Sequence, residues 1–110
     1  MPTVRGTLEL PDNAPETAAA VRIRVEDVTR ADAGSVIIGE QVLHDVSLPG
    51  LRFEVPVTGI DPNARYTVRI HVDIAGTGTL STGDLLTTQH VPVLTRGAPD
   101  TVIVPVTPLP

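Results

Sequence analysis

Three histidines, His44, His71 and His90, are the side chains of this sequence that most directly suggest metal chemistry. Imidazoles bind Zn²⁺ or Cu²⁺ when a fold brings several of them together. No two of the three stand at a short motif spacing such as H-x-x-x-H, so only folded geometry could form a shared site. His71 lies between Arg69 and Asp73 on the polar side of an alternating stretch, which indicates an exposed side chain.

Three aspartates, Asp27, Asp32 and Asp45, flank expected loops. A cluster of loop carboxylates could bind Ca²⁺, which prefers oxygen ligands. An aspartate at the corner between a strand and a loop more often accepts hydrogen bonds from its own backbone in an Asx-turn. Asp27 before Thr29, and Asp32 before Ala33, both fit that structural role.

Nucleophilic catalysis has no support in this sequence. The serines Ser35, Ser47 and Ser81 do not stand in a G-x-S-x-G motif. The glycines of GTGTLSTG, residues 76–83, resemble a phosphate-binding loop only superficially, because no Lys-Ser/Thr pair and no helix follow them. We therefore expect a protein that is not an enzyme and has no cofactor.

Four arginines lie on the outward faces of expected strands and alternate with acidic residues such as Glu26 and Glu54. They are Arg22, Arg24, Arg52 and Arg69. Charge pairs across a wet sheet are the simplest interpretation, each contributing a few tenths of a kcal/mol. The functional alternative is a recognition surface, since an exposed sheet face or edge is where a sandwich without a catalytic cleft would bind a partner protein.

The overall composition excludes several classes of function. A net charge of −5, with eight arginines and no lysine, argues against binding a nucleic-acid backbone. Phe53 and Tyr66 are the only aromatic residues, too few for base stacking. Cysteine is absent, and no apolar run approaches the roughly 18–20 residues that span a bilayer. The start of the sequence lacks the apolar stretch of a signal peptide, which leaves the cytosol and an envelope location after removal of a leader both open.

Short alternating segments separated by turns predict an all-β protein. The segments are Thr3–Leu10, Val21–Glu26, Ser35–Leu43, Leu51–Val57, Tyr66–Ile74, Leu85–Leu94 and Thr101–Val106. About seven strands at this spacing are typical of a single antiparallel β-sandwich, Ig-like or transthyretin-like, that occupies residues 1–110 as one domain, with a small closed barrel as the alternative. The residues expected to be buried are Ile23, Val25, Phe53, Tyr66, Val68, Ile70, Val93 and Val104.

Some local features can also be predicted. Gly39 inside a strand indicates a bulge or a close approach of another backbone. Pro56 places its strand at a sheet edge or at a bulge, because proline cannot donate to a ladder. We expect Glu16–Ala20 to be a loop, Ala75–Asp84 to be the most mobile connection, and the tail from Thr107 onward to be frayed.

The sequence resembles the YbaY/YscW family of bacterial envelope lipoproteins along nearly its whole length. The matching segments are GTLELP at Gly6–Pro11, IRVEDVTRADA at Ile23–Ala33, IGEQ at Ile38–Gln41, LRFEVP at Leu51–Pro56, IDPNARYTV at Ile60–Val68 and VPVLTRGAP at Val91–Pro99. The DVTRADA and PVLTRGAP segments are the most specific, and the order and spacing of all six make coincidence improbable.

The resemblance implies a small β-sandwich lipoprotein of the periplasm or outer membrane, with no catalytic residues. One branch of the family acts as pilotins, which help secretin subunits of type III secretion to reach and assemble in the outer membrane. This chain differs from the pattern in lacking a signal peptide and the lipid-bearing cysteine, and its connection at Ala75–Asp84 is longer.

We therefore expect a non-enzymatic, envelope-associated protein that binds another envelope protein in a chaperone-like or scaffolding role. Its surface would be a strand edge or the face that carries Arg22, Arg24, Arg52 and Arg69. The alternative is a sandwich that binds a small ligand or a metal ion through the histidines or the loop aspartates.

Overall fold

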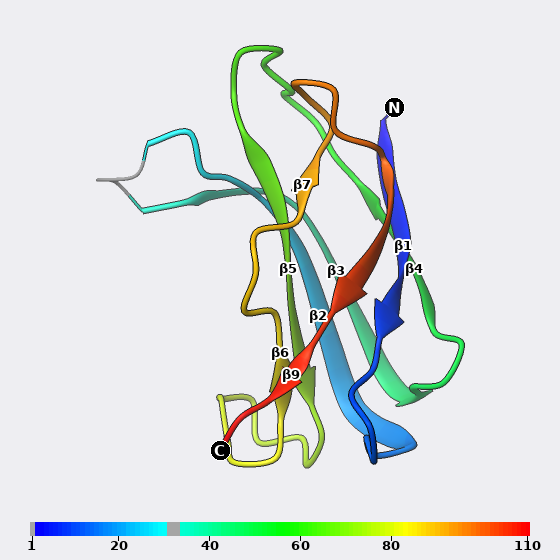
Figure 1. The fold of residues 1–110 in the computed structure, drawn as a ribbon. Coiled ribbons are helices and arrows are strands. Elements are labelled where there is room, and N and C mark those ends of the chain that lie inside the picture. The colour runs from blue at the N-terminus through cyan, green and yellow to red at the C-terminus, as the bar shows by residue number, and fades with distance from the viewer. Residues whose placement is uncertain (1, 31–33) are drawn as a thin grey trace.

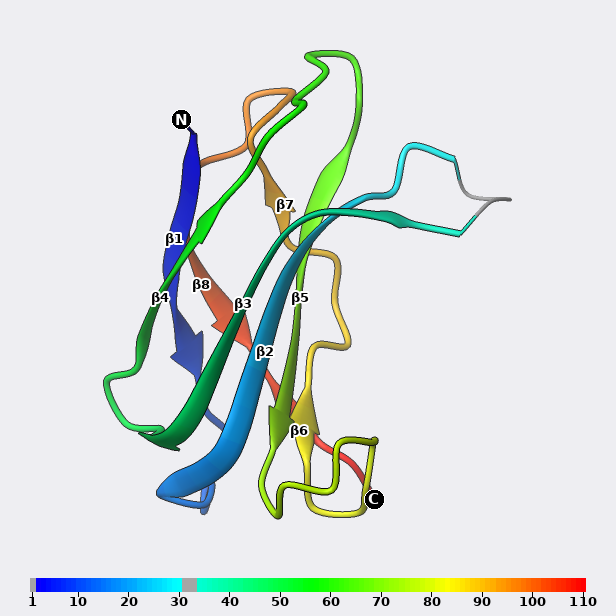
Figure 2. The same ribbon diagram turned by 180° about the vertical axis from the view of Figure 1, so that it is seen from behind.

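The computed structural model describes residues 2–30 and 34–110, and these residues form two packed β-sheets without a helix (Figure 1; Figure 2). In chain order the strands are β1 (Thr3–Glu9), β2 (Thr17–Asp27), β3 (Val36–Ser47), β4 (Arg52–Pro56), β5 (Tyr66–Asp73), β6 (Leu85–Leu86), β7 (Pro92–Val93), β8 (Thr101–Pro105) and β9 (Thr107–Pro108). The predicted all-β sandwich is confirmed.

The smaller layer is a three-stranded sheet of order β4-β1-β8, and the larger is a six-stranded sheet of order β3-β2-β5-β6-β9 in which β7 also pairs with β5. One detail of the prediction was wrong, because β1 and β8 run parallel, with Arg5 opposite Thr101. Alternation within a strand shows which side chains face the core, but it carries no information about the direction of a distant partner strand.

The expected features at Gly39 and Pro56 both occur. The β2–β3 register shifts between Val25 and Glu26, so Ile38 is an additional residue in β3 beside Gly39. A Cβ on Gly39 would lie 2.6 Å from the carbonyl oxygen of Pro56, so another backbone does approach it closely. Pro56 itself lies in β4, an edge strand, as predicted.

The expected strand at Leu85–Leu94 divides into β6 and β7, which pair with opposite ends of β5 (Figure 1). Between β6 and β7, threonine side chains replace part of the backbone hydrogen bonding with β5. Thr87 Oγ1 accepts from Ile70 N at 3.3 Å, and Thr67 Oγ1 accepts from Val91 N at 3.0 Å and donates to Val91 O. The local hydroxyl bonds therefore satisfy backbone groups that a continuous strand would have paired.

Two further expectations about segments were wrong. Thr17–Ala20 belongs to β2 rather than to a loop, because it pairs with the end of β3 and buries Ala18 and Ala20. Residues 107–108 form β9, which pairs with β6, and Leu109 N donates to Asp84 O at 2.8 Å. Tertiary pairing thus overrides the low strand propensity of alanine and proline.

A single hydrophobic cluster fills the space between the sheets. All eight predicted core residues are at most 2% exposed. Phe53 comes from the three-stranded sheet and Ile23 and Ile70 from the six-stranded one, so the inward faces of both layers meet as alternation predicts. The Tyr66 hydroxyl accepts from Asp61 N at 2.8 Å, which satisfies the polar end of the largest buried side chain.

Candidate functional site

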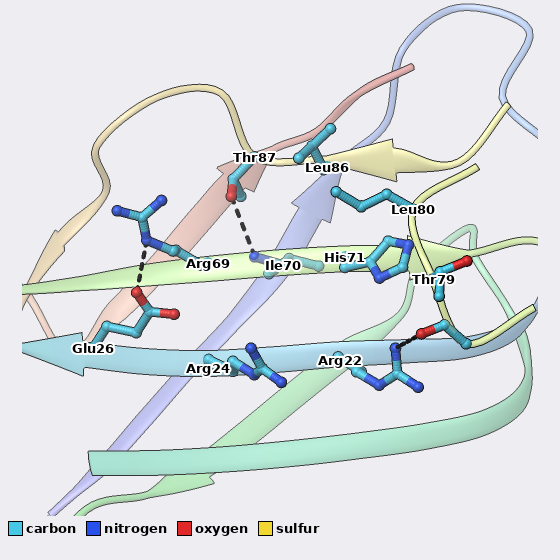
Figure 3. Close-up of a pocket in the computed structure, with 11 residues that line it drawn as sticks. Arg22, Arg24, Glu26, Arg69, Ile70, His71, Thr79, Leu80, Leu86 and Thr87 are labelled. Atoms are coloured by element: carbon cyan, nitrogen blue, oxygen red, sulfur yellow. Dashed lines mark hydrogen bonds and ion pairs between the residues drawn. The ribbon is translucent and has the colours of Figure 1, made fainter. Parts of the chain in front are cut away.

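The outer face of the six-stranded sheet carries a hollow of about 340 Å³ between β2, β5, β6 and the loop that follows β5 (Figure 3). Its lining includes three of the four predicted arginines, together with a histidine and two leucines: Arg22, Arg24, Arg69, His71, Leu80 and Leu86. We name this hollow the arginine groove. It is the place where outward side chains of β2 and β5 lie beside β6 and the loop after β5.

Strand alternation and register together bring these arginines into one place. In β2 the buried residues Val21, Ile23 and Val25 alternate with the outward Arg22 and Arg24. In the pairing of β2 with β5, Arg24 lies directly opposite Arg69 and Arg22 lies opposite His71. Residues directly opposite on one face are close neighbours, so cationic side chains from two strands share one surface.

Two glutamates offset the repulsion between Arg24 and Arg69. Arg24 Nε donates to Glu40 Oε2 at 2.5 Å, and Arg69 Nε donates to Glu26 Oε1 at 2.8 Å. Each of these ion pairs uses the Nε donor, and within residues 2–30 and 34–110 no hydrogen bond uses a terminal nitrogen of Arg24 or Arg69. A guanidinium has five N–H donors, so both side chains retain donors beyond these ion pairs.

Arg22 differs from its neighbours because, within residues 2–30 and 34–110, no carboxylate pairs with it. Its Nη1 donates to the carbonyl oxygen of Gly78 at 3.4 Å, a long hydrogen bond (Figure 3). Arg22 is therefore the arginine of this groove whose guanidinium donors remain free of an internal carboxylate within the described residues.

Two buried aspartates hold the loop that borders the groove. Asp73 is 1% exposed and accepts from Gly76 N at 2.9 Å, Thr77 N at 3.1 Å and Gly78 N at 2.9 Å. The amide of Gly78 contributes most to holding the pKa of Asp73 below its usual value, with help from the other two amides and the charge of His71, while burial opposes the shift.

Asp84, also 1% exposed, holds the other end of the same loop. Its carboxylate accepts from Ile74 N at 3.1 Å and Ser81 N at 3.1 Å, and its Oδ2 lies 2.8 Å from His71 Nε2. The connection at 75–84, expected to be the most mobile, is thus anchored at both ends by buried carboxylates. His71, interpreted as exposed from the sequence, is half-buried at the rim of this network.

The structure separates Arg52 from the other three predicted arginines. Arg52 lies in β4 of the three-stranded sheet and lines a different hollow, together with Arg5 and Glu54. The two sheets present their outer faces in opposite directions, so one binding surface cannot include all four arginines. This part of the prediction was wrong, because alternation places a residue on the outward face of a strand without identifying its sheet.

The alternative of a metal site gains no support from the described residues. Among residues 2–30 and 34–110, no three His, Cys, Asp or Glu side chains gather as a metal site, so His44, His71 and His90 do not converge. Asp27 instead forms the expected Asx-turn: its Oδ1 accepts from the hydroxyl and the backbone N of Thr29, and these bonds lower its pKa. Asp45 lies within β3, and Asp32 lies outside the described residues.

Sequence reasoning missed the roles of Asp73, Asp84 and Glu26. All three sit among polar residues whose pattern indicates exposure, yet they are at most 5% exposed. The available signal was the run of glycines after Asp73, because successive small residues leave backbone amides free for one carboxylate. Ser35 also has a structural role, since its hydroxyl donates to Glu26 Oε1 at 2.7 Å.

The fold and the exposed groove define this chain as a small all-β sandwich protein. None of the described residues forms a helix long and apolar enough to cross a membrane. The chain matches the family model described as "Type III secretion system lipoprotein chaperone (YscW)" over residues 1–106. It therefore belongs to the YscW family, which confirms the resemblance found in its sequence.

One solved structure shows the same fold over almost the whole chain. It is described as an alternative pilotin from the type II secretion system of Vibrio cholerae, with a TM-score of 0.80 and 23% sequence identity. The similarity covers 98% of this chain and 96% of the other. A comparison with curated protein sequences finds no match.

Proposed function

We propose that this protein is a non-enzymatic chaperone of the bacterial envelope that binds a component of a secretion system through the arginine groove. Membership of a family of secretion-system lipoprotein chaperones supports the protein-binding role. The observation that carries the choice of surface is the three arginines Arg22, Arg24 and Arg69, which the β2–β5 register gathers around one open hollow.

The strand edges are less suitable for a partner than this face. The edge of β3 carries a bulge beside Gly39, and bulges disrupt the flat ladder that an added strand needs. Gln41 Oε1 also accepts from Glu54 N at 3.0 Å, so side-chain bonding ties the edges of β3 and β4 together. The outer edge of β8 is five residues long and ends at Pro105, which cannot donate to a ladder.

A non-enzymatic role agrees with the surroundings of the hydrogen-bonded pair His71 and Asp84. His71 and Asp84 resemble two members of a hydrolytic triad, but no hydroxyl among the described residues bonds to His71. The nearby Ser81 hydroxyl bonds with the hydroxyl of Thr77 at 3.0 Å and with Thr79 O instead. The pair therefore lacks an activated nucleophile and is better explained as an anchor for the loop.

Deletion of the gene in its native host tests the function. The amounts of outer-membrane secretion-system components are measured by quantitative mass spectrometry in inner-membrane, periplasmic and outer-membrane fractions. We expect one such component to be lost or misplaced, and expression of the wild-type chain to restore it. An unchanged distribution of every secretion-system component would contradict the chaperone role. Recovery of the endogenous protein only in the cytosol would contradict its envelope location.

A further inference from the structure

The arginine groove combines free arginine donors with two leucine side chains. Leu80 is 58% exposed and lies on the loop that walls the groove, and Leu86 lies opposite His71 in the β5–β6 register. Figure 3 shows Leu80 and Leu86 side by side above β5, with Arg22 and Arg24 on the neighbouring β2. Cationic and apolar contacts are thus available within one hollow of about 340 Å³.

We propose that this groove binds an extended, acidic segment of the partner protein, with carboxylates of the segment held by the free donors of Arg22, Arg24 and Arg69 and an apolar side chain resting on Leu80 and Leu86. The inference rests on the proposed function and names the chemistry of its partner. The terminal nitrogens of a guanidinium match a carboxylate in a bidentate arrangement, and these are the donors that the internal ion pairs leave unused.

The carboxylates around the groove favour singly charged ligand groups over more highly charged ones. Glu26 and Glu40 pair with Arg69 and Arg24, and Asp73 and Asp84 hold the adjacent loop, so a dianionic phosphate would meet more repulsion than a single carboxylate. Arg24 and Arg69 lie directly opposite each other, and an anion between them would further relieve the repulsion of these like charges.

The loop that borders the groove is held in place by contacts within the protein itself. Asp73 fixes the amides of residues 76–78, and Asp84 fixes Ser81, so the segment that carries Leu80 is held at both ends by buried carboxylates. A site that is ordered before binding loses less conformational entropy when the ligand arrives. Leu80 on this loop therefore keeps its position relative to the arginines.

Three fluorescein-labelled, capped peptides test the proposal by fluorescence anisotropy at low salt. The probes are Ser-Glu-Leu-Glu-Ser, its glutamine analogue Ser-Gln-Leu-Gln-Ser, and Ser-Glu-Ser-Glu-Ser, all with the wild-type chain. We expect the first peptide to bind roughly tenfold more tightly than the glutamine analogue, and more tightly than the peptide without leucine. Equal affinity for the first two peptides would overturn the proposal.

Variants with a matched control identify the surface. Arg22→Gln and Arg69→Gln together are expected to remove the preference for glutamate, whereas Arg52→Gln on the opposite sheet retains it. Leu80→Ser is expected to remove only the preference for leucine. Circular dichroism and thermal melting establish that each variant is folded. An equal effect of Arg52→Gln, or no effect of the double substitution in a folded chain, would refute the assignment.

Competition separates a peptide ligand from other anions. Inorganic phosphate and vesicles containing phosphatidylglycerol are each added to the complex with the first peptide. Displacement by phosphate at concentrations below those of free unlabelled peptide, or tighter binding to vesicles than to peptide, would overturn the proposal in favour of a phosphate or lipid site. Weaker competition by both supports a carboxylate-bearing segment.

The same double variant separates failure of this inference from failure of the proposed function. Full restoration of the deletion strain by the chain carrying Arg22→Gln and Arg69→Gln would overturn the groove as the site and leave the chaperone role intact. Absence of any effect of the deletion itself would contradict the chaperone role. We expect the wild-type chain, but not the double variant, to restore delivery of the component.

Discussion

Replacing Asp73 by asparagine is expected to destabilise the protein and to change its response to acid. The Asp73 carboxylate is 1% exposed and accepts three backbone N–H bonds. Asparagine has one acceptor oxygen, and its NH₂ group would face the amide of Gly78, so one donor loses its partner. The other two bonds lose their charge assistance. Since bonds to a charged group contribute about 1.5–3 kcal/mol each and the buried charge also carries a desolvation cost, we expect a net loss of about 2–4 kcal/mol at pH 7.

The pH dependence of this loss follows from the lowered pKa of Asp73. A carboxylate with a lower pKa in the folded state stabilises the protein above the pKa of the unfolded chain, about 3.9, and this contribution disappears as the pH falls through the folded value. The difference in unfolding free energy between wild type and Asp73→Asn should therefore be constant from about pH 5 to 7 and smaller at pH 3.

Urea unfolding followed by circular dichroism at pH 7, 5 and 3 measures both effects. Asp100→Asn, which removes the same charge from an exposed position, is the matched control and is expected to change the free energy by less than about 0.5 kcal/mol. A variant at Asp73 as stable as wild type at pH 7 would refute the role of the three amide bonds. A difference that does not shrink at pH 3 would show that the charge is not its cause.

Two further substitutions test the packing of the sandwich. Ile70→Ala, at a core position 2% exposed, should cost about 2–5 kcal/mol in urea unfolding, and a nearly unchanged transition would contradict the β5 register. Gly39→Ala should cost about 1–3 kcal/mol, because the added Cβ would meet Pro56 O at 2.6 Å and Val57 Cγ1 at 2.8 Å. The control is Gly34→Ala, whose added Cβ would have open space around it. Equal melting temperatures of the two variants would exclude the close approach at Gly39.

The sequence contains enough information for the strands and the core, because both depend on alternation within a few residues. Ile23, Phe53 and Ile70 are buried as predicted, and Gly39 marks both a bulge and a close backbone contact. The parallel pairing of β1 with β8 was not predictable from local pattern, since it joins segments from opposite ends of the chain.

The candidate site was predictable only in part, because it also depends on the pairing of strands that are distant in sequence. Alternation placed Arg22, Arg24 and Arg69 on outward faces, but only the β2–β5 register shows that they meet. Arg52 has the same local pattern and lies on the other sheet. Asp73 lies on the outward, polar side of its strand, yet backbone amides of the following loop bond to its carboxylate. The positions of these amides depend on the fold of that loop, which alternation does not predict.

The position of β1 between β4 and β8 has a consequence for the order in which the protein folds during its synthesis. β1 is made before the other strands, but one of its two neighbours, β8, is made about a hundred residues later and ends at Pro105. Until that segment has emerged, the three-stranded sheet is incomplete and Val104 cannot cover the inner face of the larger sheet. Contacts of such wide sequence separation form slowly and late. The nascent chain therefore exposes much of its future core until β8 has emerged from the ribosome, and the sandwich closes only after that strand has been made.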